Sequence, residues 1–399
     1  MAAELSWVVR AANRVGPWVT REPSLEPARL VAEARRRTGL HDFGDADVMA
    51  ALERLTASFQ AEARLSFLGG RLVRRDLLRR LMNLLHIQAV VDSDPSVMRT
   101  VLHRPLVVTG LPRSGTTFLQ RLLAGHPDNR TLRFYELVDP AAPDPVAFRK
   151  GLARYQRVLF SARGRALRQA IHPASAEDPE ECWHLLANTF RSPVDALFFG
   201  LEGYARWLFA QDAVPAYRHY ARQLRVLCRG AAQRRLVLKC PSHLASLQAL
   251  LKVLPDVRVV WLHRDPVQAV ASTCSLVRLR RSLAIPREDP TRIGRQTLDL
   301  LSTSVARGLD ARLVLGEQSF VDLSFKALVN DPLATVEQLY DRLGERLDPA
   351  ARQHMKHAPN HLRVPRGRPH RYNMEDFGLA SDRVRAAFAQ YGRRFSDEW

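Results

Sequence analysis

A glycine-bounded turn between two apolar patterns holds the residues of this chain best suited to chemistry. Residues 106–123 read LVVTGLPRSGTTFLQRLL, with Gly110 and Gly115 bounding the turn and Thr116 and Thr117 following it. The first apolar run predicts a buried strand, and the leucines after the threonines predict a helix that begins at the turn. A helix start offers unpaired backbone N–H groups and the positive end of a dipole. The segment therefore predicts a cradle for a phosphate-like anion.

The spacing of this turn follows the nucleotide-binding P-loop, Gly-x4-Gly-Lys-[Ser/Thr], except that Thr116 replaces the lysine. A kinase or NTPase uses that lysine on the phosphates and needs a carboxylate for magnesium. Here the cation is Arg113, and a later apolar run, 257–262, is followed closely by Arg264. Two arginines without an evident metal carboxylate favour an anionic donor handled without a metal. A P-loop kinase or NTPase is the alternative enzyme, and a plain strand-to-helix turn is the structural alternative.

The composition is strongly basic. The chain has 60 Lys and Arg against 41 Asp and Glu, a formal net charge of +19, and only five of the basic residues are lysines. The arginine excess fits arginine-based anion recognition and equally fits a coding bias of the source genome. The arginines are dispersed rather than interleaved with aromatic residues, which favours a solvated basic surface over a nucleic-acid site. A basic protein that binds nucleotide without chemistry is the second alternative function.

The cysteines and apolar runs bear on the compartment. The four cysteines sit singly, so neither a zinc site nor a disulfide framework is predicted. The first residues, MAAELSWVVRAANRVGPW, lack the pattern of a secretory leader, and no apolar run is long enough to span a membrane. These features predict a cytoplasmic protein with no integral membrane segment and no nucleic-acid partner. They leave the oligomeric state open.

The order of the patterns predicts an α/β fold preceded by helices. Residues 1–100 predict a helical N-terminal extension, with helices over 30–37, 45–68 and 73–91 and a break at Gly69-Gly70. Residues 101–399 predict the catalytic domain, in which strand-like runs alternate with helices. These runs are 106–110, 235–239, 257–262 and 319–323. The alternation indicates a three-layer αβα parallel sheet with ligands at the carboxyl ends of the strands.

A helical insertion is expected at about 140–233, between the first two of these strands. Its many aromatic residues are more typical of a core than of a ligand wall, although an apolar acceptor pocket is compatible with them. Within it, Asp178-Pro179-Glu180-Glu181 predicts a helix start, with an aspartate cap and proline at the first position. These acids are therefore expected to cap a helix rather than to catalyse.

Three segments together resemble a known family. GLPRSGTTFLQRLLAGHP, RFYELVDP and LKCPSHLASLQALLKVLPDVRVVWLHRDPVQAVAS are similar to sulfotransferases that use 3′-phosphoadenosine 5′-phosphosulfate (PAPS), and are closer to the bacterial and tyrosylprotein branches than to the cytosolic steroid and phenol enzymes. The similarity covers roughly residues 103–380. It implies a P-loop-NTPase-like fold and the transfer of a sulfuryl group, without a metal, to a hydroxyl of a small-molecule, lipid or carbohydrate acceptor.

The resemblance also implies donor contacts. The 5′-phosphosulfate would be held by Arg113, Ser114, Gly115, Thr116 and Thr117. Arg264 and Ser272 match the contacts of the family to the 3′-phosphate. Arg366, with Arg368, partly matches a loop that closes over the nucleotide, and a solvated loop is the alternative for this segment.

Catalytic roles follow from the same resemblance. Lys239 would lie near the transferring sulfuryl group, with Arg113 as a further cation, and a strand-end salt bridge is the alternative for the lysine. Two residues compete for the role of base. Glu136 stands where the tyrosylprotein branch places its catalytic glutamate, and His243 lies four residues after Lys239, near a histidine of the cytosolic members. A capping or ion-paired glutamate and a hydrogen-bonded histidine are the structural alternatives.

Overall fold

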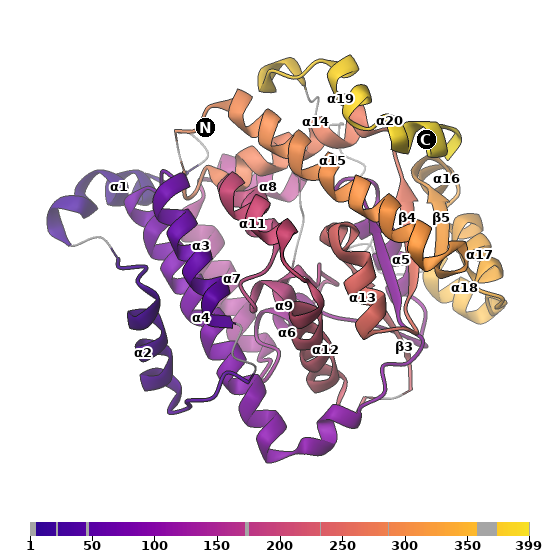
Figure 1. The fold of residues 1–399 in the computed structure, drawn as a ribbon, viewed down its shortest axis with the longest axis horizontal. Helices are drawn as coiled ribbons and strands as arrows, with labels where there is room; N and C mark the ends of the chain where they lie inside the picture. The colour runs from indigo at the N-terminus through magenta and orange to yellow at the C-terminus, as the bar shows by residue number, and fades with distance from the viewer. Residues whose placement is uncertain are drawn as a thin grey trace.

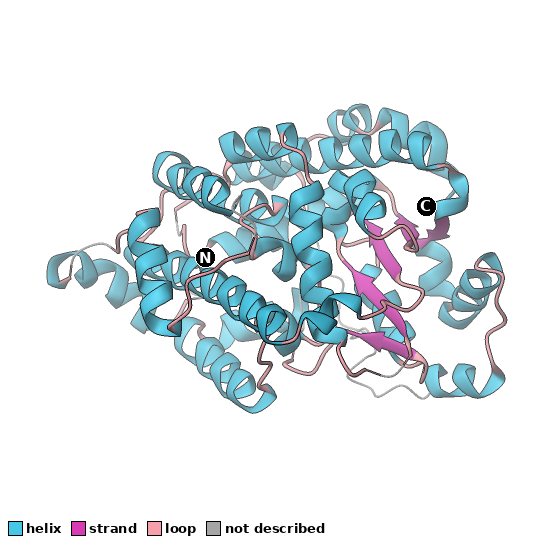
Figure 2. Cartoon of the chain, turned by 60° about the horizontal axis from the view of Figure 1, so that its bottom comes forward, coloured by secondary structure: helices cyan, strands magenta, loops and turns pink. Residues whose placement is uncertain are grey.

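The computed structural model describes residues 5–20, 23–44, 48–171, 175–231, 233–285, 287–356 and 373–398. Its centre is a sheet of five parallel strands in the order β2-β3-β1-β4-β5. The strands are β1 (Leu106–Gly110), β2 (Asn129–Thr131), β3 (Arg235–Lys239), β4 (Arg258–His263) and β5 (Phe320–Ser324). Helices cover both faces of this sheet (Figures 1 and 2). The predicted three-layer α/β fold is confirmed.

Four of the strands lie within one residue of the predicted runs. The sequence prediction missed β2, because Asn129, Arg130 and Thr131 form no apolar run. This short strand lies at the edge of the sheet and pairs with β3. An edge position buries less side-chain surface than a central one, so β2 carries little hydrophobic signal.

The two faces of the sheet pack against different helices because successive strand side chains point to opposite sides. Leu106 and Val108 share a core with Leu119 of α5 (Thr116–Ala124), whereas Val107 belongs to a core that includes Leu224. The first layer contains α5, α17 (Pro332–Arg342) and α18 (Pro349–Lys356), and the second contains α12 (Val214–Cys228), α13 (Leu247–Val253) and α15 (Pro290–Leu315) (Figure 1). The remaining helices around the sheet are α14 (Pro266–Arg281), α16 (Phe325–Asn330), α19 (Ser381–Ala387) and α20 (Ala389–Phe395).

The residues before the sheet are helical, as expected. They form α1 (Trp7–Val19), α2 (Pro27–Thr38), α3 (Val48–Glu62) and α4 (Phe67–Ser93). Leu30, Leu52 and Leu77 build a core of their own, to which the insertion contributes Leu201 and Tyr204. The extension therefore packs on the insertion.

The expected break at Gly69-Gly70 is wrong, because both glycines lie inside α4. A side chain at Gly69 would collide with the backbone of Ala284, since its Cβ would lie 2.4 Å from that carbonyl oxygen. The glycine therefore serves a close helix contact rather than a turn. The helix expected over 45–68 also ends earlier, at Glu62.

The insertion is helical, and its helices are α7 (Pro145–Leu159), α8 (Ala162–Ile171), α9 (Trp183–Ala187), α10 (Pro193–Phe199), α11 (Glu202–Ala210) and α12. The short α6 (Phe134–Val138) precedes it. The predicted helix start at residues 178–181 is wrong: this segment is extended, Pro179 forms a β-bridge with Arg133, and α9 begins at Trp183. The Asp178 carboxylate accepts a hydrogen bond from the Ser175 backbone instead of capping a helix.

Among the described residues, no helix is both long and apolar enough to cross a membrane. The four cysteines are free thiols, and all four are buried. The described part of the chain contains no group of three or more His, Cys, Asp or Glu side chains placed to hold a metal ion.

Candidate active site

The turn between β1 and α5 has the geometry of an anion cradle. Gly110 has φ 141° and Gly115 has φ 89°, and Arg113 between them has φ 71°. A Cβ at Gly110 would lie 2.4 Å from the Leu262 carbonyl oxygen, so the turn requires glycine there. No described side chain caps the first turn of α5, whose N-cap residue is Gly115. The start of this helix is therefore available to an anionic ligand.

The structure brings three of the predicted donor residues together. Arg113 Nε donates a hydrogen bond to Ser272 Oγ at 3.0 Å. Arg264 donates to the Arg113 carbonyl oxygen, and its guanidinium lies over the Phe325 ring at 4.2 Å. These residues come from the ends of β1 and β4 and from α14, so they converge at the carboxyl edge of the sheet.

Ser114 belongs to the framework of the same turn. Its hydroxyl donates a hydrogen bond to the Leu111 carbonyl oxygen at 2.7 Å, and the residue is buried. This hydrogen bond closes the turn from within. Thr116 is also buried, whereas Thr117 is half-buried and reaches a neighbouring strand.

Lys239 lies beside this turn at the end of β3. Its backbone is level with Val108 of the neighbouring β1, and its side chain is fully buried. Lys239 Nζ donates to Thr117 Oγ1 at 3.2 Å and to Glu181 Oε1 at 2.9 Å. Glu180 is more distant, with its Oε1 4.0 Å from the same nitrogen. The cation thus joins the P-loop-like turn to the insertion.

Glu181 is a residue beside Lys239 that the sequence prediction places at a helix start rather than at this site. The extended run that carries it is fixed by backbone hydrogen bonds: Glu180 N donates to Leu132 O at 3.2 Å, and Cys182 N donates to Lys239 O at 3.0 Å. The local pattern resembles a helix cap, and the partner lysine is 58 residues away along the chain. No spacing rule connects two such positions, so only the fold reveals the contact.

Glu136 lies in the first turn of α6 with both carboxylate oxygens engaged. Oε1 accepts a hydrogen bond from Arg130 at 2.8 Å, and Oε2 accepts one from the Arg133 backbone at 2.7 Å. Glu136 is therefore both a helix-capping residue and ion-paired, which is the structural alternative to a catalytic role. A role in proton transfer remains a prediction.

His243 is completely buried behind Lys239, in the short 3₁₀ helix η2 (Pro241–Ser246). Its Nδ1 lies 2.7 Å from the Tyr217 hydroxyl and its Nε2 lies 3.3 Å from Cys182 Sγ. Burial raises the pKa of Tyr217 well above its ordinary value, so this hydroxyl keeps its proton. The histidine is thus hydrogen-bonded at both nitrogens, and its catalytic role also remains a prediction.

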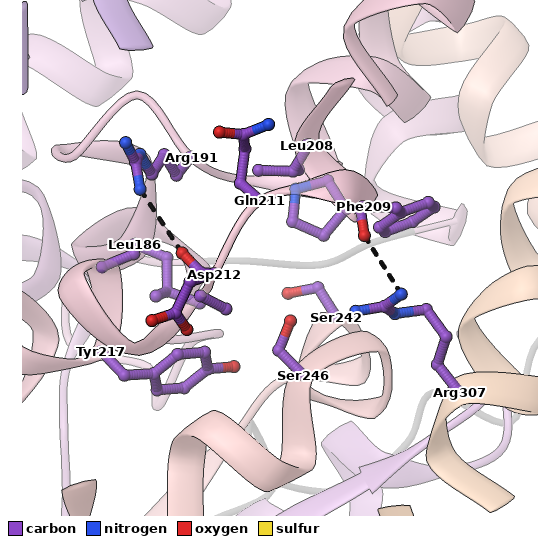
Figure 3. A pocket seen from close by; sticks show the side chains of 13 residues that line it. Leu186, Arg191, Leu208, Phe209, Gln211, Asp212, Tyr217, Ser242, Ser246 and Arg307 are labelled. Atoms are coloured by element: carbon purple, nitrogen blue, oxygen red, sulfur yellow. Dashed lines mark hydrogen bonds between the residues drawn. The ribbon is translucent and has the colours of Figure 1, made fainter. Parts of the chain in front are cut away.

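A pocket lies next to this histidine, between the insertion and η2 (Figure 3). Leu186, Leu208 and Tyr217 contribute apolar surface, and the hydroxyls of Ser242 and Ser246 point toward its interior. Arg307 spans one side and donates to the Phe209 carbonyl oxygen at 3.2 Å. The pocket combines aromatic and aliphatic walls with a few polar groups, but its free volume of about 20 Å³ holds no more than about one water molecule, so it is too small for a small-molecule ligand in this structure.

Arg366 and Arg368 lie outside the described residues, so their predicted place over the nucleotide stays a prediction.

Comparison with known proteins agrees with this geometry. A family model described as "Sulfotransferase family" matches residues 105–349. The sulfotransferase STF1 from Mycobacterium tuberculosis shares 30% identity, with a TM-score of 0.78, over 93% of this chain and 100% of its own. The sulfotransferase STF9 from Mycobacterium avium shares 28% identity, with a TM-score of 0.83, over 94% of this chain and 98% of its own.

No curated protein matches the chain. The matched family segment begins at β1 and includes the P-loop-like turn, Lys239, Arg264 and Ser272. Because the family model spans more than half of the sequence and the similarity to STF1 extends over nearly all of it, the protein belongs to the sulfotransferase family, whose members transfer sulfuryl groups.

Proposed function

We propose that the donor is 3′-phosphoadenosine 5′-phosphosulfate and that the acceptor group is a hydroxyl. One observation carries the proposal: Arg113 and Arg264 meet at the start of α5, beside Ser272. Guanidinium groups present planar sets of donors that match phosphate oxygens. Two of them at one helix start suit a donor with an anionic group at each end of its ribose.

The donor contacts follow from this placement. The 5′-phosphosulfate would bind to residues 113–117, where the start of α5 favours negative charge. Arg264 and Ser272 would hold the 3′-phosphate. Arg366 is proposed as a cover for the bisphosphate.

Lys239 would stabilise the charge that develops on the leaving phosphate. An ammonium group has three N–H donors, and the described residues accept hydrogen bonds from two of them, through Thr117 and Glu181. The third is available to a donor oxygen. Sulfuryl transfer, like phosphoryl transfer, depends mainly on positioning and on such fixed positive charge, and the proposal requires no metal.

The acceptor would be a small-molecule, lipid or carbohydrate alcohol. Glu136 and His243 remain candidates for the base that takes its proton. We further propose a cytoplasmic, bacterial enzyme, since the buried free thiols suit a reducing compartment and both similar structures are mycobacterial.

The test is calorimetric titration with adenosine 3′,5′-bisphosphate and, separately, with ATP and magnesium. We expect clear preference for the bisphosphate, at least a tenfold loss of its affinity in Arg264→Ala, and no change in Arg352→Ala. Arg352 is a matched control because it is an exposed arginine that pairs with Glu337 on the outer layer.

Two outcomes would replace the proposal. Preference for magnesium-ATP would indicate a P-loop kinase or NTPase. Bisphosphate binding without transfer of labelled sulfate to any alcohol in an acceptor screen would indicate a nucleotide-binding protein that has kept the family fold without its chemistry.

A further inference from the structure

We propose that Glu181 accepts the proton of the acceptor hydroxyl during sulfuryl transfer, an inference that rests on the function proposed above. Its carboxylate is hydrogen-bonded to Lys239 Nζ at 2.9 Å, and Lys239 contacts Thr117 of the donor cradle. A base must lie within about one hydrogen bond of the proton that it removes. Only the side chain of Lys239 therefore separates Glu181 from Thr117, beside the expected position of the sulfuryl group.

Availability separates Glu181 from the other two candidates. Both oxygens of Glu136 and both nitrogens of His243 are engaged, and both side chains are buried. The Glu181 side chain is 23% exposed, and among the described residues only Oε1 has a hydrogen-bond partner. Its second oxygen can therefore face an incoming alcohol, while the first stays on the lysine.

The backbone on both sides of Glu181 is fixed by hydrogen bonds. Glu180 N is bonded to Leu132 O, and Cys182 N is bonded to Lys239 O. A further bond, from Gln120 Nε2 to Glu180 O at 3.2 Å, ties the run to α5. A group held in this way loses little entropy when the acceptor arrives, which is how positioning contributes to rate.

The acceptor oxygen forms a bond to sulfur, and the bond between sulfur and the bridging phosphate oxygen breaks with its electron pair on the phosphate. The acceptor proton moves to Glu181, and Lys239 faces the negative charge of the leaving group. The carboxylate then returns the proton to solvent through its exposed side.

The first experiment compares Glu181→Gln with Glu136→Gln and with the surface control Glu177→Gln. Glutamine keeps an oxygen for Lys239, but it carries no negative charge and cannot take the proton. We expect kcat to fall about 100-fold or more in Glu181→Gln, with bisphosphate affinity within threefold of the unaltered enzyme. Glu177 lies in the same segment, is only partly buried and pairs with Arg149, so its substitution is expected to leave turnover unchanged.

A rescue experiment separates proton transfer from the positioning of Lys239. In Glu181→Ala, added formate is expected to restore part of kcat because it supplies a carboxylate in the vacated space. A carboxylate that only repositions Lys239 would rescue equally well as formate and as the more basic acetate, whereas proton transfer predicts greater rescue by acetate. Turnover of Glu181→Gln within threefold of the unaltered enzyme, or loss confined to Glu136→Gln, overturns the inference. Failure of the unaltered enzyme to bind the bisphosphate would instead refute the proposed donor.

A second observation, far from this site, carries an independent inference: we propose that α1 binds the surface of an anionic lipid bilayer. Five exposed apolar residues of α1 form what we call the α1 stripe: Trp7, Val8, Val15, Trp18 and Val19. Trp18 is 90% exposed and Trp7 is 72% exposed. At about 100° per residue these positions fall on one face of the helix. Exposed tryptophans on such a face are typical of helices that lie in a membrane interface.

The opposite face of α1 is anchored to the protein, so the stripe is directed outward by packing. Val9 is buried, and Asn13 Oδ1 accepts a hydrogen bond from Leu68 N at 2.9 Å. Gly16 approaches Phe67 so closely that a Cβ would lie 2.2 Å from its ring. Figure 1 shows α1 at the margin of the molecule, away from the sheet.

Charge favours a lipid surface over a second copy of the chain. Residues 7–19 and 145–171, which form α1, α7 and α8, contain nine arginines and lysines and no aspartate or glutamate. Helix α1 lies against α7, and Leu5 forms a β-bridge with Phe160. A symmetric dimer through this face would bring two such basic surfaces together, whereas anionic headgroups would neutralise them.

The test is sedimentation of the full chain with vesicles of phosphatidylglycerol and phosphatidylcholine, compared with pure phosphatidylcholine. We expect binding to the anionic vesicles, and at least a tenfold weaker partition for Trp7→Ser/Trp18→Ser. Leu313→Ser/Val314→Ser is the matched control, since it removes two equally exposed apolar side chains from α15. Equal binding by both double variants, or no binding to anionic vesicles, overturns the inference. A dimer that the tryptophan variant alone converts to monomer, measured by light scattering, would assign the stripe to self-association.

Discussion

Two buried cations of this molecule have nearly the same exposure and different surroundings. Arg80 joins α4 to α10 through two hydrogen bonds to Asp195, at 2.8 and 2.7 Å, and lies 2.7 Å from Asp76. It also donates to the Ala187 carbonyl oxygen at 3.3 Å. The Asp195 side chain is 2% exposed, so this ion pair is closed to solvent.

Lys239 is just as buried, but its ion pair opens to solvent on one side. Its carboxylate partner, Glu181, is 23% exposed, and its second contact is a hydroxyl of the donor cradle. The pair of Arg80 and Asp195 meets the requirements of a structural ion pair, because both of its charges are buried and compensated; only the additional partner of Arg80, Asp76, is exposed, at 40%. Among the described residues, the Lys239 pair leaves one N–H donor and one carboxylate oxygen without a hydrogen-bond partner, which is an arrangement that a bound substrate can complete.

The largest expected effect is on catalysis at Lys239. Replacing it in Lys239→Met removes a fixed cation from the leaving group, and we expect kcat/KM to fall about 10³-fold, or about 4 kcal/mol of transition-state stabilisation. The free energy of unfolding should change little, because Glu181 remains open to water. Transfer of labelled sulfate and urea unfolding check the two parts. A loss of less than tenfold would make Lys239 structural, like Arg80.

The opposite pattern is expected for Arg80→Met. The variant leaves Asp195 and Asp76 without their shared cation, and breaking a buried pair in this way costs about 3 kcal/mol or more of unfolding free energy. Activity per folded molecule should persist, because the pair lies outside the donor cradle. The control is Arg352→Met, whose exposed pair with Glu337 should contribute less than about 1 kcal/mol. Equal losses of unfolding free energy in Arg80→Met and Arg352→Met would contradict a stabilising role for the buried pair.

The contrast also explains what could be predicted from the sequence. The strand-turn-helix at residues 106–123 could be predicted because its glycines, apolar runs and helix start are local features. The four main strands were predictable for the same reason, whereas β2 has no apolar run. The local pattern of residues 178–181 predicts a helix start, and the contact of Glu181 with Lys239, 58 residues away, has no local signal. Local sequence patterns thus predict single helices and strands. Contacts between distant segments depend on the packing of the whole fold and have no such local pattern.

A third effect concerns the acid sensitivity that the buried His184 of α9 gives to the fold. Burial and the nearby charge of Arg79 lower the pKa of His184 from 6.5 to about 3 in the folded protein. Below pH 6.5 His184 binds a proton in the unfolded chain but stays neutral in the folded protein. The free energy of unfolding therefore falls as the pH falls toward 3, by up to about 1.4 kcal/mol per pH unit. His184→Phe keeps an aromatic ring against Trp183 and removes the titrating group.

The measurement for His184 is urea unfolding at pH 7 and pH 5. The unaltered protein should lose about 2 kcal/mol more than His184→Phe between these two values. The donor cradle provides the contrast, because Lys239→Met should show the same loss as the unaltered protein. Identical losses in His184→Phe and the unaltered protein would mean that other groups cause the acid sensitivity.

The smallest expected effect concerns the second partner of Lys239. Thr117→Val removes one hydrogen bond to the ammonium group, and we expect kcat/KM to fall about tenfold with little change in unfolding free energy. Thr109→Val is the matched control, because the Thr109 hydroxyl donates to the Cys240 carbonyl oxygen at 3.0 Å in the neighbouring, fully buried part of β1. It should lower stability by about 1 kcal/mol and leave kcat unchanged. If Thr117→Val instead lowers the free energy of unfolding and leaves kcat/KM unchanged, the Thr117 hydroxyl supports the fold, as Asp76 does beside Arg80. The contact between Thr117 and Lys239 would then be structural rather than part of the donor site.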